Sequence, residues 1–294
     1  MNNIKYGLNS NVSTLKTVLL KDPEAAFKSQ KIIDLQWENL NFIEKPDYKK
    51  SIIQYEKFVD ILNDNNVEIL YIPEDEKTSL DSIYTHDPMF MTPNGAVIGN
   101  MGKKQREPET SMMKNYLAEI GIPIFGEIDN EGTLEGGDVI WVNDNTAAVG
   151  LTYRTNNKGI NQLRKILSSI SVDLICVDLP HWNGPVDVLH LMSLISPLKE
   201  DLFLIYEKLL PIGFLKLLNN LDIKTISIAD EDYDSLGCNV LPLSTTKCLI
   251  TSGNDKTFKI IEENGIEVIE FQASEICYKG SGGPTCLTRP IYRK

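Results

Sequence analysis

A fivefold repeat is the feature that most restricts how this chain can fold. An amphipathic helical pattern, a short turn and a β-rich run recur five times, and the apolar residues of each helix are spaced three and four apart. A second short apolar run precedes each helix, at residues 17–20, 96–99, 147–150, 202–205 and 247–250. Equivalent strands start 43 to 55 residues apart, at Val67, Ile122, Val172, Ile223 and Ile266.

This repeat predicts a closed ring of modules. Each unit contains a strand, a helix and a further strand, and periods near 50 residues with several strands per unit are typical of rings rather than of a doubly wound sheet. An α/β fold that alternates helix and strand without forming a ring is the alternative. Because no linker interrupts the chain, we predict a single α/β domain over residues 1–294. In a ring, loops at one end of every unit face a shared axis and can form one pocket.

Charge and cysteine content argue against several classes of protein. The net charge is −12 and no run of lysine or arginine could follow a phosphate backbone, so we expect no nucleic-acid partner. An acidic surface is compatible with a small cationic substrate. No apolar run approaches the roughly 18 to 20 residues of a membrane span, and the N-terminus lacks the apolar core of a signal peptide.

Five scattered cysteines without CxxC spacing argue against a zinc site and a disulfide framework, and they favour a reducing cytoplasm. No pattern in the sequence specifies the oligomeric state, and a homodimer is the assembly that we consider.

A glycine-rich turn near the C-terminus presents one of these cysteines. Residues 280–288 read GSGGPTCLT, so Cys286 follows three glycines and a proline. Glycine reaches backbone conformations that are closed to other residues, and proline fixes one φ angle. Such a turn can present a thiol to a substrate, which makes Cys286 a candidate nucleophile. A C-terminal loop that merely contains a cysteine is the alternative.

Two candidate substrate-binding residues flank the second apolar run. Asp87, in THDPMF, is a loop carboxylate before a proline, for which an Asx turn or a cap is the structural alternative. Arg106, in QREPE, is a candidate anchor for a substrate carboxylate, because a guanidinium binds carboxylates through two parallel hydrogen bonds. Glu107 and Glu109 suit a capping role in the first turn of the following helix.

The LEGGDV segment places two carboxylates around a glycine pair. Glu135 and Asp138 stand immediately before a predicted buried strand, where an unpaired carboxylate is costly. We predict that Glu135 orients and charge-stabilises a histidine or binds a cation directly, and that Asp138 is a substrate-binding residue. A glycine hairpin with solvated acids is the alternative.

Arg154 and His190 complete the set of candidates. Arg154 stands before a helix that Thr155 or Asn156 can cap, so it can project toward the axis, and an ordinary surface arginine is the alternative. His190 is one of three histidines and lies between two leucines at the entrance to the fourth unit. Such a context usually means a core histidine. With a thiol and an acid in matching loops, we predict a general acid and base instead.

The chain resembles the guanidino-group-modifying enzymes, which include arginine deiminases, dimethylarginine dimethylaminohydrolases and amidinotransferases. THDPMF, QREPE, LEGGDV, LTYRTN, LHLMS and GGPTCLT occur in that family's order and spacing. The resemblance implies a five-bladed α/β propeller, the pentein fold. It also implies roles for the candidates: Cys286 as nucleophile, His190 as acid and base, Glu135 as its partner, Asp87 on the guanidinium, and Arg106 and Arg154 on the substrate carboxylate.

The reaction that this resemblance implies is hydrolysis of a guanidino C–N bond of arginine or a methylated arginine. It passes through a covalent thiouronium and requires neither a metal nor an organic cofactor. Amidino transfer to an amine, arginine deiminase, arginine dihydrolase or citrulline hydrolase activity, and a catalytically inactive binding module are the alternatives.

Two departures from the family pattern bear on the substrate. Arginine deiminases and amidinotransferases carry an aspartate two residues after the histidine, where this chain has Met192. This replacement is expected to remove a contact to the guanidinium and to leave an apolar surface, as in the dimethylarginine dimethylaminohydrolases. Those enzymes often carry another acid at the place of His86.

Overall fold

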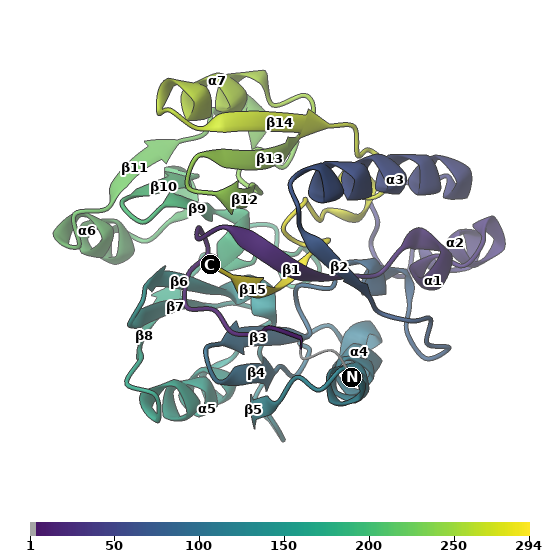
Figure 1. Ribbon diagram of the computed structural model, residues 1–294, viewed down its shortest axis with the longest axis horizontal. Coiled ribbons are helices and arrows are strands. Elements are labelled where there is room, and N and C mark those ends of the chain that lie inside the picture. The colour runs from purple at the N-terminus through teal and green to yellow at the C-terminus, as the bar shows by residue number, and fades with distance from the viewer. Residues whose placement is uncertain (1–3) are drawn as a thin grey trace.

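Five three-stranded sheets surround a central axis in the computed structural model, which describes residues 4–294 (Figure 1). Four sheets use consecutive strands, in the orders β3-β4-β5, β6-β7-β8, β9-β10-β11 and β12-β13-β14. The fifth has the order β15-β1-β2, so the two ends of the chain share one sheet. This arrangement confirms the predicted ring. The prediction that the N-terminus lacks the apolar core of a signal peptide rests in part on residues 1–3, which lie outside the described residues.

Every sheet, or blade, is built in the same way. An inner strand near the axis pairs antiparallel with a middle strand, which pairs parallel with an outer strand. The inner strands are β3 (Met89–Thr92), β6 (Val139–Asn143), β9 (Ile195–Lys199), β12 (Leu241–Ser244) and β15 (Arg289–Arg293). The middle strands are β1 (Leu15–Leu20), β4 (Gly95–Ile98), β7 (Thr146–Leu151), β10 (Leu202–Ile205) and β13 (Lys247–Thr251). The outer strands are β2 (Glu68–Tyr71), β5 (Ile124–Glu127), β8 (Asp173–Asp178), β11 (Lys224–Ser227) and β14 (Glu267–Phe271).

A helix connects the middle and outer strands of each blade, because parallel neighbours cannot be joined by a tight turn. These helices are α3 (Tyr48–Asp64), α4 (Glu107–Glu119), α5 (Asn157–Ser168), α6 (Ile212–Asn220) and α7 (Asp255–Glu263), and they lie on the outside of the ring (Figure 1). In α5, Ile160, Leu163 and Leu167 form the buried stripe. Asn156 caps this helix by accepting a hydrogen bond from the Gly159 amide, as predicted for one of two candidates.

The sequence pattern located the middle strands, the outer strands and these helices. Of the inner strands, it predicted only the buried strand that follows Asp138, which is β6. The inner strands are short and almost wholly buried, so they show no alternation of apolar and polar residues. Two further short helices, α1 (Pro23–Ala26) and α2 (Gln30–Gln36), lie between β1 and α3. No helix within residues 4–294 is long and apolar enough to cross a membrane.

Ring closure has a direct consequence for the candidate cysteine. β15 pairs antiparallel with β1 through Leu19 and Arg289, which completes the first blade with the last strand of the chain. Cys286 therefore precedes an inner strand, as Asp87 and His190 do in their own blades. Residues separated by two hundred positions are thus delivered to the same end of the ring.

Candidate active site

Loops that precede the inner strands converge on a cavity of about 630 Å³. Asp87 stands just before β3, Glu135 before β6, His190 before β9 and Cys286 before β15. Asp87, His190 and Cys286 line the cavity, together with Arg106 and Arg154. Glu135 lies behind His190 and is fully buried. The structure therefore brings all of these predicted residues to one place.

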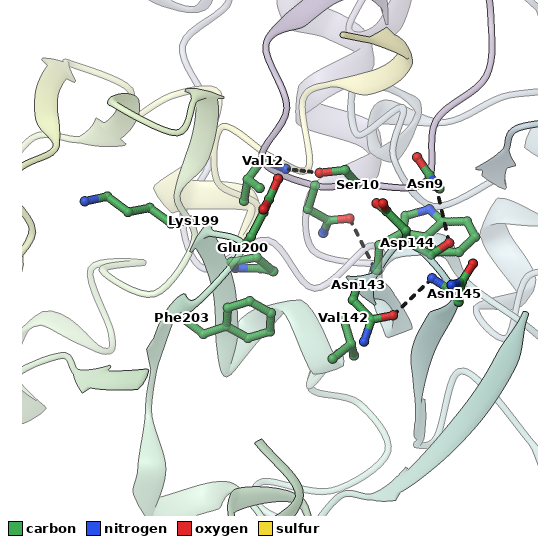
Figure 2. Close-up of a pocket in the computed structure, with 13 residues that line it drawn as sticks. Asn9, Ser10, Val12, Val142, Asn143, Asp144, Asn145, Lys199, Glu200 and Phe203 are labelled. Carbon is green, nitrogen blue, oxygen red and sulfur yellow. Dashed lines mark hydrogen bonds between the residues drawn. The ribbon is translucent and has the colours of Figure 1, made fainter. Parts of the chain in front are cut away.

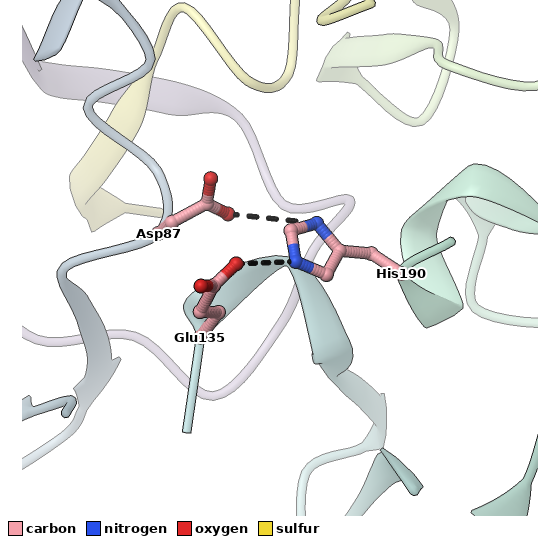
Figure 3. Close-up of side chains that lie close together, drawn as sticks. All are labelled: Asp87, Glu135 and His190. Atoms are coloured by element: carbon pink, nitrogen blue, oxygen red, sulfur yellow. Dashed lines mark hydrogen bonds and ion pairs between the residues drawn. The ribbon is translucent and has the colours of Figure 1, made fainter. Parts of the chain in front are cut away.

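His190 stands between two carboxylates (Figure 3). Its Nε2 atom lies 2.7 Å from Oε2 of Glu135, and its Nδ1 atom lies 3.8 Å from Oδ1 of Asp87. The hydrogen bond to Glu135 occupies Nε2, so Nδ1 is the nitrogen left to exchange protons with a ligand. Burial alone would lower the pKa of His190, but Asp87, Asp138 and Glu135 together raise it to about 9. The imidazole is therefore protonated at neutral pH.

Glu135 is held as a carboxylate by its own neighbours. Oε1 accepts hydrogen bonds from the backbone amides of Gly102 and Lys103, both at 3.0 Å, and Nη1 of Arg154 lies 3.3 Å from Oε2. Burial opposes ionisation, but the hydrogen bond with His190 and the charges of His190 and Arg154 hold the pKa of Glu135 below its usual value. Glu135 can thus orient His190 and stabilise its positive charge.

Arg106 has a different environment from the one predicted. Its Nη1 atom binds Oδ2 of Asp87, while Nε and Nη2 form a two-pronged pair with Glu109 at 2.9 and 2.8 Å. Nη2 also donates to the Tyr84 carbonyl oxygen. Its guanidinium is committed to protein partners, so these contacts do not support the predicted role of Arg106 as an anchor for a substrate carboxylate, and that role stays a prediction. Glu109, predicted to cap α4, is buried instead and fixes Arg106.

Asp138 is not among the described residues that line the cavity, so its position does not support the predicted role in substrate binding, which stays a prediction. Its side chain is fully buried, with Oδ1 accepting from the Leu191 amide at 3.0 Å and Oδ2 from the Thr152 hydroxyl at 2.8 Å. Burial raises the pKa of Asp138 to about 6. Because Leu191 follows His190 directly, Asp138 positions the loop that carries the histidine.

Cys286 lies in a compact turn after the glycines. The Leu287 amide donates to the Gly283 carbonyl oxygen at 3.2 Å, and the Thr288 amide donates to the Thr285 carbonyl oxygen at 3.1 Å. Burial raises the pKa of the Cys286 thiol to about 11, and the nearby Asp87 carboxylate adds to the rise. Before a substrate binds, the sulfur is therefore a neutral thiol.

The glycines of this turn are required by the ring of Tyr84. A Cβ atom on Gly280 would stand 2.0 Å from the Tyr84 hydroxyl oxygen, and one on Gly282 would stand 2.4 Å from Cε1 of the same ring. Such separations are far inside van der Waals contact, so no larger residue fits without displacing the tyrosine. The glycine pattern that singled out this stretch thus reflects close packing beneath the turn that leads to the cysteine.

Comparison with known proteins agrees with this geometry. The family described as arginine deiminase matches residues 79–218 and 212–293, which together cover most of the chain. The chain belongs to the arginine deiminase family. A dimethylarginine dimethylaminohydrolase from Pseudomonas aeruginosa is 28% identical over 245 residues, which are 83% of this chain and 89% of that protein.

Solved structures extend the similarity to the whole fold. The Pseudomonas aeruginosa dimethylarginine dimethylaminohydrolase, as a cysteine-to-serine mutant with citrulline, has a TM-score of 0.76 at 24% identity and covers 94% of this chain and 98% of its own. The N-terminal domain of a cyanobacterial arginine dihydrolase, bound to its substrate, has a TM-score of 0.80 at 17% identity with the same two coverages. At these identities the structures show the five-bladed pentein fold.

The two departures from the family pattern both lie away from the main cavity. His86 and Met192 line a separate void of about 30 Å³, and neither is among the described residues around the main cavity. Nδ1 of His86 binds the Thr288 carbonyl oxygen at 2.8 Å, and burial lowers the pKa of His86 to about 3, so it is neutral. The apolar surface expected at Met192 therefore does not line the main cavity.

Asp87, Glu135 and His190 are also the residues that could hold a metal ion. One donor atom from each lies within 4.8 Å of the other two, and imidazole with carboxylates is a ligand set that suits zinc. Two of these ligands, however, already bind cations, since Arg106 contacts Asp87 and Arg154 contacts Glu135. These contacts favour a role in proton transfer. That the enzyme works without a metal or other cofactor stays a prediction.

Sequence reasoning missed two further groups at the site. Lys103 lines the cavity and pairs with Asp81 at 2.7 Å, and Asn239 lines it beside Cys286. Lys103 stands in a basic run that reads as surface, and a lone asparagine carries no motif. Asn239 lies just before the inner strand β12, and this position becomes a signal only when the inner strands are known.

A second cavity, of about 370 Å³, lies at the other ends of the inner strands (Figure 2). β6 and β9 begin after Glu135 and His190 and end at Asn143 and Lys199, which line this second cavity. Its other walls include Ser10, Val12 and Phe203. None of the predicted site residues is among the described residues around it.

Proposed function

We propose that this protein is a cysteine-dependent hydrolase that cleaves a guanidino C–N bond of arginine or a methylated arginine. The observation that supports this most strongly is that Cys286, His190 and Asp87 line one cavity, with Glu135 hydrogen-bonded to the histidine. Membership of the arginine deiminase family supports the same reaction class. The roles assigned to individual residues below are part of the proposal.

Substrate binding uses the buried charges of the site. The Asp87 carboxylate has a pKa held well below its usual value by Arg106 and His190 despite burial, so it is ionised and attracts the substrate cation. Arg154 takes the α-carboxylate. Only its Nη1 atom contacts Glu135 among residues 4–294, which leaves the Nε–Nη2 edge for a two-pronged pair. The bound guanidinium then lies between Cys286 and His190.

The first chemical step forms a bond between Sγ of Cys286 and the guanidino carbon and breaks one C–N bond. A cation beside the sulfur favours the thiolate, which offsets the high pKa of the free thiol. His190 donates the proton that the departing amine needs, and the thiol proton replaces it, so the net transfer is from sulfur to the amine. The product is an S-alkylthiouronium on Cys286 and a free amine or ammonia.

The second step consumes water. His190, which has regained a proton from the thiol, first releases that proton to solvent and then accepts one from a water molecule, whose oxygen attacks the thiouronium carbon. The carbon–sulfur bond breaks, the departing sulfur takes the proton that the protonated ureido group gives up, and the ureido product leaves with the thiol restored. The only proton released is the one that His190 gave to solvent. Amidino transfer differs only at this point, because an amine replaces water.

Product analysis tests this proposal. The protein is incubated separately with arginine, dimethylarginine, citrulline and agmatine, with and without an acceptor amine, and ammonia, methylamines and ureido products are measured. Hydrolysis predicts citrulline with dimethylamine or ammonia, independent of the acceptor. Ornithine that appears only with an acceptor indicates transfer, and ammonia with ornithine and no citrulline indicates arginine dihydrolysis. Cys286→Ser is expected to abolish turnover and Cys176→Ser, at an exposed thiol, to preserve it. Absence of turnover with every compound contradicts the proposal.

Location and assembly are part of the proposal as well. The described residues contain five unpaired cysteines, four of them at least partly buried, which suits a reducing cytoplasm. A homodimer is proposed as the assembly, with sedimentation velocity over a range of concentrations as its test. A single monomer peak at every concentration would contradict it.

A further inference from the structure

The fivefold construction of the ring points to a residue that the proposed mechanism does not yet use. Four inner strands are preceded by Asp87, Glu135, His190 and Cys286. The remaining inner strand, β12, is preceded in the same way by Asn239, which is 7% exposed and lines the main cavity. Every blade therefore delivers one polar side chain to the same region, and the fifth is an amide.

Asn239 contacts the candidate nucleophile directly. Its Nδ2 atom lies 3.2 Å from Sγ of Cys286, and its Oδ1 atom accepts a hydrogen bond from the Thr285 amide at 3.0 Å. The backbone amide of Thr285 can only donate, so it fixes which end of the side chain is the oxygen. The amino group is thereby turned toward the sulfur, as a donor.

Gly283, three residues before Cys286, makes room for this contact. A Cβ atom on Gly283 would stand 2.4 Å from both Cγ and Oδ1 of Asn239. Any larger residue at position 283 would push the amide away from the turn that carries Cys286. The packing of the GGPTC segment is therefore fitted to the asparagine as well as to Tyr84.

The sulfur needs such a donor because its surroundings oppose its charge. Burial and the Asp87 carboxylate both disfavour the thiolate, whereas the hydrogen bonds from Asn239 and the Gly283 backbone favour it, with a smaller contribution from Arg106. Cys286 in turn shifts the pKa values of the titratable groups of Tyr84, Cys277 and Arg289. Unlike these groups, the amide of Asn239 does not titrate, so its effect on the sulfur does not change with pH.

We propose that Asn239 is a catalytic residue whose amide N–H holds the Cys286 sulfur in place and stabilises the thiolate as it forms. The inference rests on the proposed function, in which this sulfur is the nucleophile. A hydrogen bond to a charged sulfur is a charge-assisted one, which is stronger than a bond between neutral groups. Asn239 thus supports the step in which the thiol loses its proton.

Alkylation of Cys286 by iodoacetamide tests this without requiring turnover. The rate is measured from pH 6 to 10 for the wild type, Asn239→Asp and Asn239→Ala, with peptide mapping to identify Cys286. Asn239→Asp keeps an oxygen for the Thr285 amide but replaces the donor with a carboxylate oxygen, whereas Asn239→Ala removes the donor without adding a charge. Loss of the donor is expected to raise the thiol pKa by about one to two units, which lowers the alkylation rate at pH 8 about three- to tenfold after the greater reactivity of a more basic thiolate is allowed for.

Asn183→Asp is the matched control. It adds the same charge to the rim of the same cavity, where Asn183 contacts Asp187 rather than the sulfur. Its alkylation rate is expected to stay within about twofold of the wild type. Thermal melting confirms that each variant is folded. Should Asn239→Asp fail to fold, Asn239→Ala supplies the comparison.

The outcome separates this inference from the proposed function. A folded Asn239 variant whose Cys286 reacts at the wild-type rate, with an unchanged pH profile, overturns the inference. If alkylation slows as expected but no guanidino compound is ever turned over, the role of Asn239 toward the sulfur stands and the proposed function fails.

Discussion

The cavities of about 630 Å³ and about 370 Å³ lie at opposite ends of the inner strands β6 and β9, and the charged side chains at the two cavities differ in burial and pairing. At the larger cavity, Asp87, Glu135 and His190 are at most 5% exposed and are linked in one network of ion pairs and hydrogen bonds. At the smaller cavity (Figure 2), Asp144 and Glu200 are exposed. Burying charge is costly unless partners compensate for it, so only the first end is organised at the expense of stability.

This difference indicates which end of a symmetric ring is expected to carry the functional site. Both ends have turns from several blades, cavities and polar side chains, and cavity formation alone does not distinguish them. The distinguishing property is that buried titratable groups at one end perturb one another, which is common at catalytic sites. Variants at both ends can therefore break or sharpen the comparison.

The largest difference is expected for the nucleophile. Cys286→Ser should lower kcat/KM by about 10⁴-fold or more, since the covalent step has no substitute. Asn143→Ala at the smaller cavity should leave kcat/KM within about twofold, because Asn143 is exposed and its role is in the turn to β7. Steady-state kinetics on the best substrate checks both. Similar losses at the two ends would break the comparison.

Neutralising the partner of the histidine is expected to have the next largest effect. Glu135→Gln should reduce kcat/KM by about 10³-fold, because the neutral amide of glutamine does not stabilise the His190 imidazolium as the carboxylate does. The pKa of His190 should fall from about 9, which moves the alkaline limb of the pH–rate profile to lower pH. Glu200→Gln, a matched change at the smaller cavity, should alter neither quantity. An unchanged pH profile in Glu135→Gln would show that Glu135 does not control His190.

The same histidine should make stability depend on pH. Its pKa is raised from an ordinary value near 6.5 to about 9, so its contribution is fully present below about pH 6.5 and is lost as the pH rises through 9. The loss is on the order of 3 kcal/mol in the free energy of unfolding. Urea denaturation at pH 6, 8 and 10 should show the difference between wild type and His190→Asn shrinking by that amount. Parallel curves would contradict it, and His181→Asn, at an exposed histidine, serves as the control.

The smallest effect is expected beneath the glycine turn. The Tyr84 hydroxyl is buried and has no hydrogen-bond partner among residues 4–294. Tyr84→Phe removes this unpaired group, so the free energy of unfolding should stay the same or rise by about 1 kcal/mol, with kcat/KM within about twofold. Tyr55→Phe, at another buried hydroxyl without a partner in the described chain, is the matched control. A tenfold loss of kcat/KM in Tyr84→Phe alone would mean that this hydroxyl serves a ligand.

The sequence was sufficient to predict the ring and to single out Cys286, His190 and Glu135 as candidate site residues. Helix and strand periods are local properties, so the repeat was visible without coordinates. Cys286 and Glu135 stood in glycine-rich motifs next to apolar runs. His190 lies between two leucines, as a core histidine would, and it was singled out because a thiol and an acid stood in matching loops. Their convergence follows from the ring, because each precedes an inner strand.

The hydrogen-bond and ion-pair partners of the site residues could not be predicted from the sequence, because they depend on how the blades pack against one another. Arg106 is occupied by Asp87 and Glu109, although the motif alone presents it as open. Asp138 turns toward the Leu191 amide rather than the cavity. Asn239 gained meaning only from the position of β12, an inner strand too short and too buried to show a period.

Mass spectrometry of the protein during turnover tests the central claim most directly. The wild type is mixed with dimethylarginine or arginine, quenched in acid within milliseconds to seconds, and digested. The account predicts that the peptide containing Cys286 gains the mass of the substrate less the departing amine, and that Cys286→Ser shows no such gain. Sustained turnover with no adduct on Cys286 at any time, or with the adduct on another residue, would contradict it.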